Sequence, residues 1–195
     1  QAETFQRRIK PLLEKNEKAA YFLVDALRFE MAFEMAEGFG KENDVRLEPV
    51  LGQLPGITAV GMAALMPRAE SGLELEEKGG KILVSVQGNP LSSRNARMDW
   101  IRKASGVLTA VFKLGEVVRL TPKRKREIED ASLVVVTSQE IDRLGEDGSD
   151  EEETRTYMDD VLEKIRRAVR SLSRAGIRRF FITADHGFQM PGLEE

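Results

Sequence analysis

The chain contains one histidine, and it follows an aspartate at the end of an apolar run. Residues 178–188 are RRFFITADHGF, so Asp185 and His186 stand where a buried strand would finish. An earlier apolar run at residues 19–30, AAYFLVDALRFE, leads into Asp25 in the same way. Because open α/β sheets bind ligands at the carboxyl ends of their parallel strands, we expect these three side chains to converge. Two carboxylates and an imidazole are suitable ligands for a divalent metal ion.

A fourth candidate is the hydroxyl group of Thr58. Residues 53–68, QLPGITAVGMAALMPR, turn at Pro55 and Gly56 and then become apolar, which predicts a helix that begins at about Thr58. The free N–H groups and positive dipole of a helix N-terminus favour an anion such as phosphate, and they lower the cost of forming an alkoxide. Thr58 is therefore a candidate nucleophile, and the alternative is that it only caps its helix.

The other candidates also have structural explanations. Asp25 could cap a helix that starts at Ala26 or Leu27, and His186 could be an ordinary hydrogen-bonded histidine. The combination of these residues, rather than any single one, favours an oxygen-rich metal site beside a nucleophile. Because the chain has no cysteine, such a site can use only carboxylates, hydroxyls, water and His186.

Length and composition are those of one globular domain. The 195 residues are 41% hydrophobic and 32% charged, and the formal net charge of -3 gives no overall attraction to nucleic acid or anionic lipid. No apolar run approaches the roughly 20 residues of a bilayer span, and no signal-peptide pattern is present. We therefore expect a cytoplasmic protein without membrane contact. The missing initiator Met and the end shortly after His186 suggest a fragment of a longer protein.

Strand and helix patterns alternate along the chain. Apolar runs of strand length occur at residues 20–25, 46–54, 81–87, 133–138 and 179–183. Helical periodicity separates most of them, at residues 28–39, with Phe29, Ala32, Phe33, Ala36 and Phe39 on one face, and at residues 149–176. Continuous apolar runs of this length are typical of strands buried on both faces. The pattern predicts an α/β fold with a doubly wound, mostly parallel sheet and helices on both faces.

The remaining segments fit a single domain over residues 1–195. Residues 1–18 predict an amphipathic helix that enters the domain. Residues 70–121, approximately, are rich in turn signals and are interpreted as an insertion or cap over the sheet. Within this region, ARMDWIRKASG predicts a short helix, and VLTAVFKLGEVVRL predicts one strand or two.

Four segments, in this order, resemble a known family. VDALRFE, LPGITAVGMAALMP, EIDRLGE and ITADHGF resemble the PglZ domain of the bacterial phage-defence systems called phage growth limitation and BREX, over residues 19–190. The resemblance implies an alkaline phosphatase-like core with a middle insertion. It also implies a metal-dependent hydrolase of phosphate esters or phosphodiesters, with nucleotides or nucleic acid as possible substrates and other phage-defence proteins as partners.

The resemblance also implies roles for individual residues. Asp25, Thr58, Asp185 and His186 would bind one divalent metal ion, either Zn²⁺ or Mn²⁺/Mg²⁺, with Thr58 as the attacking group. Asp142 matches the aspartate of the third segment and is the candidate ligand for a second metal site.

Two departures from the family pattern leave a second interpretation open. Ser138 stands where PglZ-like sequences often carry a histidine, and the chain lacks the downstream histidine of the superfamily. Fewer imidazoles weaken zinc binding more than they weaken binding of magnesium or manganese. The alternative function is therefore a weak or inactive scaffold domain of a multiprotein defence complex. Arg28 could balance the charge of a bound anion or form a surface salt bridge. A third interpretation is a flavodoxin-like receiver with Asp25 as an isolated acidic site.

Overall fold

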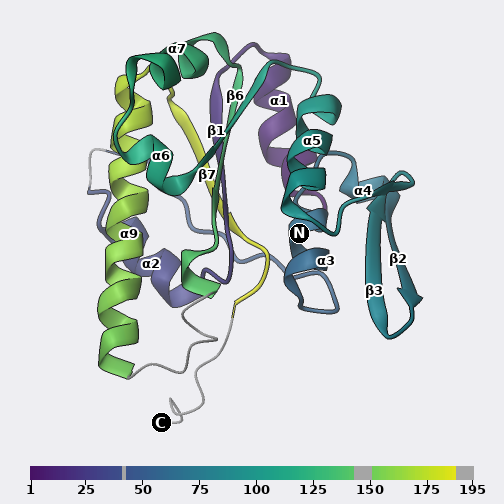
Figure 1. Cartoon of the computed structure of the whole chain (residues 1–195). Helices are drawn as coiled ribbons and strands as arrows, with labels where there is room; N and C mark the ends of the chain where they lie inside the picture. Colours follow the sequence, from purple (N-terminus) through teal and green to yellow (C-terminus); the bar gives the residue numbers. More distant parts are fainter. Residues whose placement is uncertain (41–42, 143–150, 188–195) are drawn as a thin grey trace.

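A four-stranded parallel sheet forms the centre of the protein (Figure 1). The computed structural model describes residues 1–40, 43–142 and 151–187. The strand order is β5-β6-β1-β7, with β1 at Ala19–Val24, β5 at Thr109–Lys113, β6 at Leu133–Ser138 and β7 at Arg179–Ala184. Every residue of β1 and β6 is buried, as expected for parallel strands covered on both faces. The predicted parallel α/β architecture is confirmed.

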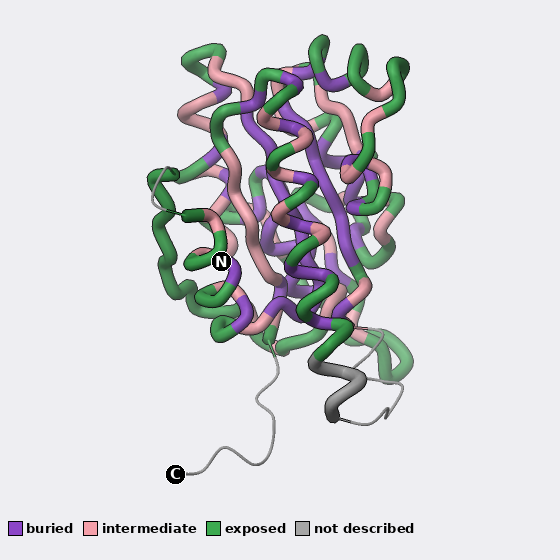
Figure 2. The backbone as a smooth tube through the Cα atoms, turned by 90° about the vertical axis from the view of Figure 1, so that its left-hand side faces the viewer, coloured by how far each residue is buried: buried purple, intermediate pink, exposed green. Residues whose placement is uncertain are grey.

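Helices cover both faces of this sheet. One side carries α2 (Phe29–Glu37), α6 (Leu114–Val118), α7 (Pro122–Asp130) and α9 (Glu151–Arg174) (Figure 1). The other side carries the π-helix η1 (Phe5–Ile9), α1 (Lys10–Glu14), α3 (Thr58–Ala64), α4 (Ala69–Gly72) and α5 (Arg94–Ala104). Residues of β1 alternate between the two cores, Ala20 and Phe22 with the first side and Tyr21 and Leu23 with the second. Figure 2 shows the buried strands between helices whose outer surfaces are exposed.

A small antiparallel sheet is inserted beside the main one. It contains β2 (Leu73–Lys78), β3 (Lys81–Val86) and β4 (Asn89–Pro90), in the order β2-β3-β4. The predicted strand at residues 81–87 therefore exists, but it belongs to this sheet instead of the parallel one. Conversely, β5 and α6 lie within the region interpreted as an insertion and yet complete the main sheet and its covering layer.

The predicted strand at residues 46–54 was wrong. Residues 45–53 have no regular secondary structure, and their apolar side chains reach the surface: Leu51 is 91% exposed and Val50 is 59% exposed. Pro49 interrupts the run and has no N–H to give to a neighbouring strand, which explains why an apolar segment does not join the sheet here.

The predicted helix at residues 28–39 forms as α2, but its expected buried face was wrong in part. Met31 and Met35 are buried against the core, whereas Phe29 is 52% exposed and Phe33 is 53% exposed. Phe39 does pack against that core, as expected. Phenylalanine, methionine and alanine residues of α2 are distributed over several of its faces. The 3.6-residue period therefore does not identify by itself which face is buried.

The other helix predictions agree with the structure. The segment ARMDWIRKASG lies largely within α5, and α9 covers the described part of the long predicted helix. Gly176 follows α9 with a φ of 97°, a conformation that favours glycine and ends the helix. Residues 149 and 150 lie outside the described ranges. Within the described ranges, no helix is long and apolar enough to cross a bilayer.

Candidate metal centre

Asp25 and Asp185 are placed side by side by the pairing of β1 with β7. Val24 pairs with Ala184 at the carboxyl ends of these parallel strands, and the aspartates are the next residues of the two chains. On the other side of β1, the Asp25 N–H donates to the Ser138 carbonyl at 2.9 Å. The two aspartates predicted to converge therefore lie at the same edge of the sheet.

Asp25, Asp185 and His186 form a compact group. One ligand atom from each lies within 4.8 Å of the others. His186 Nε2 is 3.3 Å from Asp185 Oδ2 and 3.6 Å from Asp25 Oδ1. Both aspartates are 1% exposed, and the His186 side chain is 12% exposed. These distances fit ligands that surround a single cation.

Hydrogen bonds satisfy only half of the carboxylate oxygens in this group. Asp185 Oδ1 accepts from the Ala26 N–H at 3.1 Å, and Asp25 Oδ1 accepts from the Thr58 hydroxyl at 3.3 Å. Among the described residues, Oδ2 of Asp25 and Oδ2 of Asp185 are buried without a hydrogen-bond partner. A buried acceptor left unsatisfied costs about 1–3 kcal/mol or more for a charged group. These two oxygens, one of which has His186 Nε2 at 3.3 Å, are therefore placed to bind a cation, and the donor set fits Zn²⁺, Mn²⁺ or Mg²⁺.

The pKa values of the two aspartates reflect their burial. The pKa of Asp25 is raised to about 7, mainly by desolvation and to a smaller extent by the negative charges of Asp185 and Asp142. Burial also raises the pKa of Asp185. Two adjacent buried carboxyl groups resist ionising together, and a bound cation would remove that resistance.

Thr58 points into this group instead of capping its helix. Helix α3 begins at Thr58, its N-cap is Ile57, and no side-chain hydrogen bond closes that end. The Thr58 hydroxyl oxygen lies 3.3 Å from Asp25 Oδ1 and 3.1 Å from His186 Nε2. The capping alternative for Asp25 is also wrong, because the next helix, α2, begins at Phe29 with Arg28 as its N-cap.

Gly61 lets α3 approach the end of β7 closely. A Cβ atom at this position would lie 2.5 Å from the Asp185 carbonyl oxygen and 2.9 Å from the Asp185 Cβ. Real side chains do not sit this close, so only glycine allows the observed contact. Because Gly61 is one helical turn after Thr58, the contact also fixes where the threonine hydroxyl lies.

Comparisons with known proteins agree with the geometry. The family model described as "BREX system PglZ alkaline phosphatase-like domain" matches residues 4–190. The chain belongs to the PglZ family. It is 28% identical to the alkaline phosphatase-like protein BrxZ of Escherichia coli O9:H4 (strain HS), over 96% of this chain. It is 27% identical to the alkaline phosphatase-like protein PglZ of Bacillus cereus (strain H3081.97), over 95% of this chain. The chain spans 22% of the length of each of these relatives.

The other predicted site residues of this PglZ domain lie outside the candidate metal group formed by Asp25, Asp185 and His186. Asp142 follows β6 and is close enough for its charge to raise the pKa of Asp25, but it is not one of the three grouped ligands. The Arg28 guanidinium donates to the sulfur of Met158 on α9 and makes no ion pair with a carboxylate within the described residues. The rest of the third family segment, residues 143–146, lies outside the described ranges.

Two arginines near the PglZ metal group were not predicted from the sequence. Arg97 is 6% exposed and donates to the carbonyls of Leu91 and Ser92. Burial lowers its pKa, and the negative charges of Asp25 and Asp185 oppose that shift, so Arg97 is a buried cation near both aspartates. Arg94 donates through Nε and Nη2 to the Thr137 hydroxyl. The feature of the sequence that could have identified them is the spacing in RNAR, which places both arginines on one face at the start of α5.

Proposed function

We propose that this PglZ domain is the catalytic core of a metal-dependent hydrolase that acts on phosphate esters or phosphodiesters in bacterial phage defence. The observation that carries the proposal is the pair of buried, unsatisfied carboxylate oxygens beside a threonine hydroxyl. Membership of a BREX family implies other defence proteins as partners. The alkaline phosphatase-like family supports phosphoryl chemistry at this place in the fold.

In this mechanism, Asp25, Asp185 and His186 would hold a divalent ion beside the Thr58 hydroxyl. Such an ion neutralises phosphate oxygens and lowers the cost of an alkoxide. The Thr58 oxygen attacks phosphorus in line as its proton passes to Asp25, the bond from phosphorus to the leaving oxygen breaks, the leaving oxygen takes up that proton, and the phosphoryl group is transferred to the threonine. Water then attacks the same phosphorus, releases phosphate or a phosphomonoester, and returns a proton to Thr58.

Asp25 is the group positioned to receive the Thr58 proton. Its Oδ1 already accepts the hydroxyl hydrogen bond at 3.3 Å, which is within reach of a general base. In the protein without an ion, the pKa of Asp25 is raised to about 7, mainly by desolvation, and a cation bound to this carboxylate would lower that pKa, so the hydrogen bond from Thr58 is what supports this role. The role of Asp142 is that of a charge near Asp25, as a ligand of a second ion or as part of the electrostatic surroundings.

The decisive experiment is a phosphatase and phosphodiesterase assay of the intact protein with Zn²⁺, Mn²⁺ and Mg²⁺. We expect Thr58→Ala and Asp185→Asn to lower the rate by about a thousandfold or more, as in enzymes that lose a nucleophile or its activating group. Thr58→Ser retains the hydroxyl and is expected to retain activity. Asp44→Asn is the matched control, because its side chain is 80% exposed. Equal rates in Thr58→Ala and the parent protein would refute this mechanism.

A second candidate function is an inactive scaffold within the defence complex. The observation that favours it is Ser138, a buried serine beside Asp25 where related sequences often place a histidine ligand. Calorimetric titration of the intact protein with divalent ions distinguishes the two functions. Binding that disappears in Asp185→Asn supports the enzyme, whereas no binding at millimolar concentrations supports the scaffold.

A further inference from the structure

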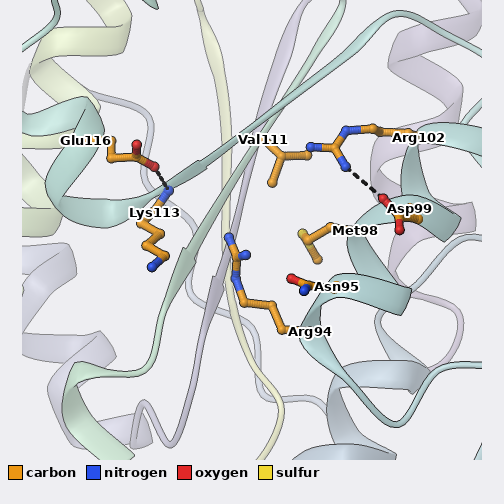
Figure 3. Close-up of a pocket in the computed structure, with 8 residues that line it drawn as sticks. All are labelled: Arg94, Asn95, Met98, Asp99, Arg102, Val111, Lys113 and Glu116. Atoms are coloured by element: carbon orange, nitrogen blue, oxygen red, sulfur yellow. Dashed lines mark hydrogen bonds and ion pairs between the residues drawn. The ribbon is translucent and has the colours of Figure 1, made fainter.

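A cavity of about 410 Å³ lies between α5 and the carboxyl end of β5 (Figure 3). This volume is within the range of sites for small molecules. The residues that line it are Arg94, Asn95, Met98, Asp99, Arg102, Val111, Lys113 and Glu116. Figure 3 shows Arg94 reaching from α5 toward the strands, with Lys113 on the β5 side of the opening. None of these residues belongs to the metal group.

The cavity opens at the same edge of the sheet as the metal group. Lys113 pairs with Thr137, and Thr137 pairs with Leu23, two residues before Asp25. Since neighbouring strands lie about 4.8 Å apart, the ends of β5 and β1 are separated by roughly 10 Å. Arg94 also lines a second, smaller cavity together with Asp25, so this residue connects the two places.

The cationic ends of Arg94 and Lys113 form no ion pair with a carboxylate within the described residues. Arg102 is paired with Asp99 at 3.1 Å, and Glu116 is paired with Arg124 at 2.8 Å. The Arg94 guanidinium donates to a neutral hydroxyl, that of Thr137.

Within the described ranges, no ion pair within 4.0 Å joins the Arg94 guanidinium or the Lys113 ammonium to an acidic side chain, although the Lys113 backbone N–H donates to the Glu116 carboxylate at 2.7 Å. The carboxylates at the cavity therefore have partners of their own, and two cationic groups remain to attract an anion.

We propose that this cavity is a second anion subsite, which binds a phosphate group of the substrate other than the one that reacts. The proposal rests on the proposed function for the identity of the reacting group. Arginine offers a planar fork and lysine a point charge, and both recognise phosphate oxygens. Met98 and Val111 give the cavity an apolar wall that suits the carbon framework between two phosphates.

The separation of the two places defines the ligand class. Because the Arg94 side chain lines the smaller cavity together with Asp25, a ligand that reaches both places must carry two anionic groups separated by one small framework such as a sugar. A nucleoside 3′,5′-bisphosphate and a short oligonucleotide both have phosphates on either side of a sugar. They share the chemistry that the subsite would recognise, whereas a nucleoside monophosphate lacks the second group.

The test is calorimetric binding to the intact protein, with and without Mn²⁺, of a deoxynucleoside 3′,5′-bisphosphate, a 5′-monophosphate and a phosphorylated dinucleotide. Lys113→Gln and Arg94→Gln are each expected to weaken bisphosphate binding about tenfold or more, in proportion to a lost charge-assisted hydrogen bond. Monophosphate binding is expected to change much less. Lys123→Gln is the matched control, because this lysine is 88% exposed on α7.

Equal bisphosphate affinities in Lys113→Gln, Arg94→Gln and the parent protein would overturn the subsite, as would a bisphosphate that does not bind the parent. An equal loss for monophosphate and bisphosphate would also overturn it, because the cavity would then bind a lone phosphate. Thermal melting of each variant establishes that it is folded. The readout does not need turnover, so an inactive metal centre with intact, Lys113-dependent binding would refute the proposed function alone. Comparison of the affinities for the phosphorylated dinucleotide and for the bisphosphate distinguishes a nucleic-acid end from a free nucleotide as the ligand.

Discussion

Gly61→Ala changes one hydrogen into a methyl group at the point where α3 touches the end of β7. The new Cβ would lie 2.5 Å from the Asp185 carbonyl oxygen, so α3 and β7 must separate by about 0.9 Å to reach ordinary contact. Overpacking of this kind costs about 1–3 kcal/mol. Alanine offsets about 0.5–1 kcal/mol of this cost, because it stabilises a helix better than glycine does. We therefore expect a net loss of about 1–2 kcal/mol in the free energy of unfolding.

The same displacement moves a proposed metal ligand. Asp185 Oδ1 is held by the Ala26 N–H, and a shift of the strand end disturbs this bond and the distance to His186. We expect divalent-ion affinity to fall about tenfold in Gly61→Ala, since errors near 1 Å in a site are costly. Urea unfolding without metal and calorimetric titration with Mn²⁺ measure the two effects separately.

Gly115→Ala is the matched control, because Gly115 also lies in a helix, α6, and an added Cβ there meets nothing within 4 Å. This variant is expected to be as stable as the parent or up to about 1 kcal/mol more stable. If Gly61→Ala behaved like Gly115→Ala in both assays, the close contact between α3 and Asp185 would not control the metal group. The reasoning from geometry to function would then be refuted.

Three further predictions concern the core and its titration. Tyr21→Phe removes the buried hydrogen bond from the Tyr21 hydroxyl to the Leu65 carbonyl, and it should cost about 1 kcal/mol in urea unfolding; an unchanged midpoint would contradict this. Met35→Ala should lower the free energy of unfolding by about 2–5 kcal/mol, whereas Phe33→Ala, at a half-exposed position, should lower it by well under half as much. A larger loss for Phe33→Ala than for Met35→Ala would mean that the face of α2 expected from the sequence is the buried one. In EDTA, the raised pKa of Asp25 means that the folded protein keeps a proton which the unfolded chain releases, so this residue lowers stability as pH rises from about 4 to about 7. Between these pH values, the melting temperature should fall more steeply with pH for the parent protein than for Asp25→Asn. An equal dependence of the melting temperature on pH in the two proteins would argue against the raised pKa of Asp25.

The strand ends were the most predictable part of the site. Asp25 and Asp185 each follow a continuous apolar run, and parallel pairing of such runs leaves little choice about where the next residues lie. Thr58 was found for a related reason, since a turn followed by an apolar helix defines the helix start. Local pattern and sheet geometry thus agree for these residues.

Other features depend on packing that a local pattern does not contain. The exposed run at residues 46–54 has the composition of a strand, but Pro49 prevents normal pairing. Arg94 and Arg97 carry the charges of ordinary surface residues, and their importance comes from the position of α5 over the sheet. Lys113 gains its position only because β5 pairs with β6, a strand that follows it by about twenty residues.

The position of β1 between β6 and β7 has a consequence for synthesis of the protein on the ribosome. One edge of β1 is completed by residues 133–138 and the other by residues 179–184. The apolar strand Ala19–Val24 therefore has an open edge until residues 179–184 have been synthesised. At about 5–20 residues per second, this interval lasts on the order of ten seconds or more. An unpaired apolar edge invites aggregation, which gives chaperones a defined segment to protect. Asp185 and His186 directly follow β7, so the candidate metal group cannot assemble before the strand that closes this edge has been synthesised.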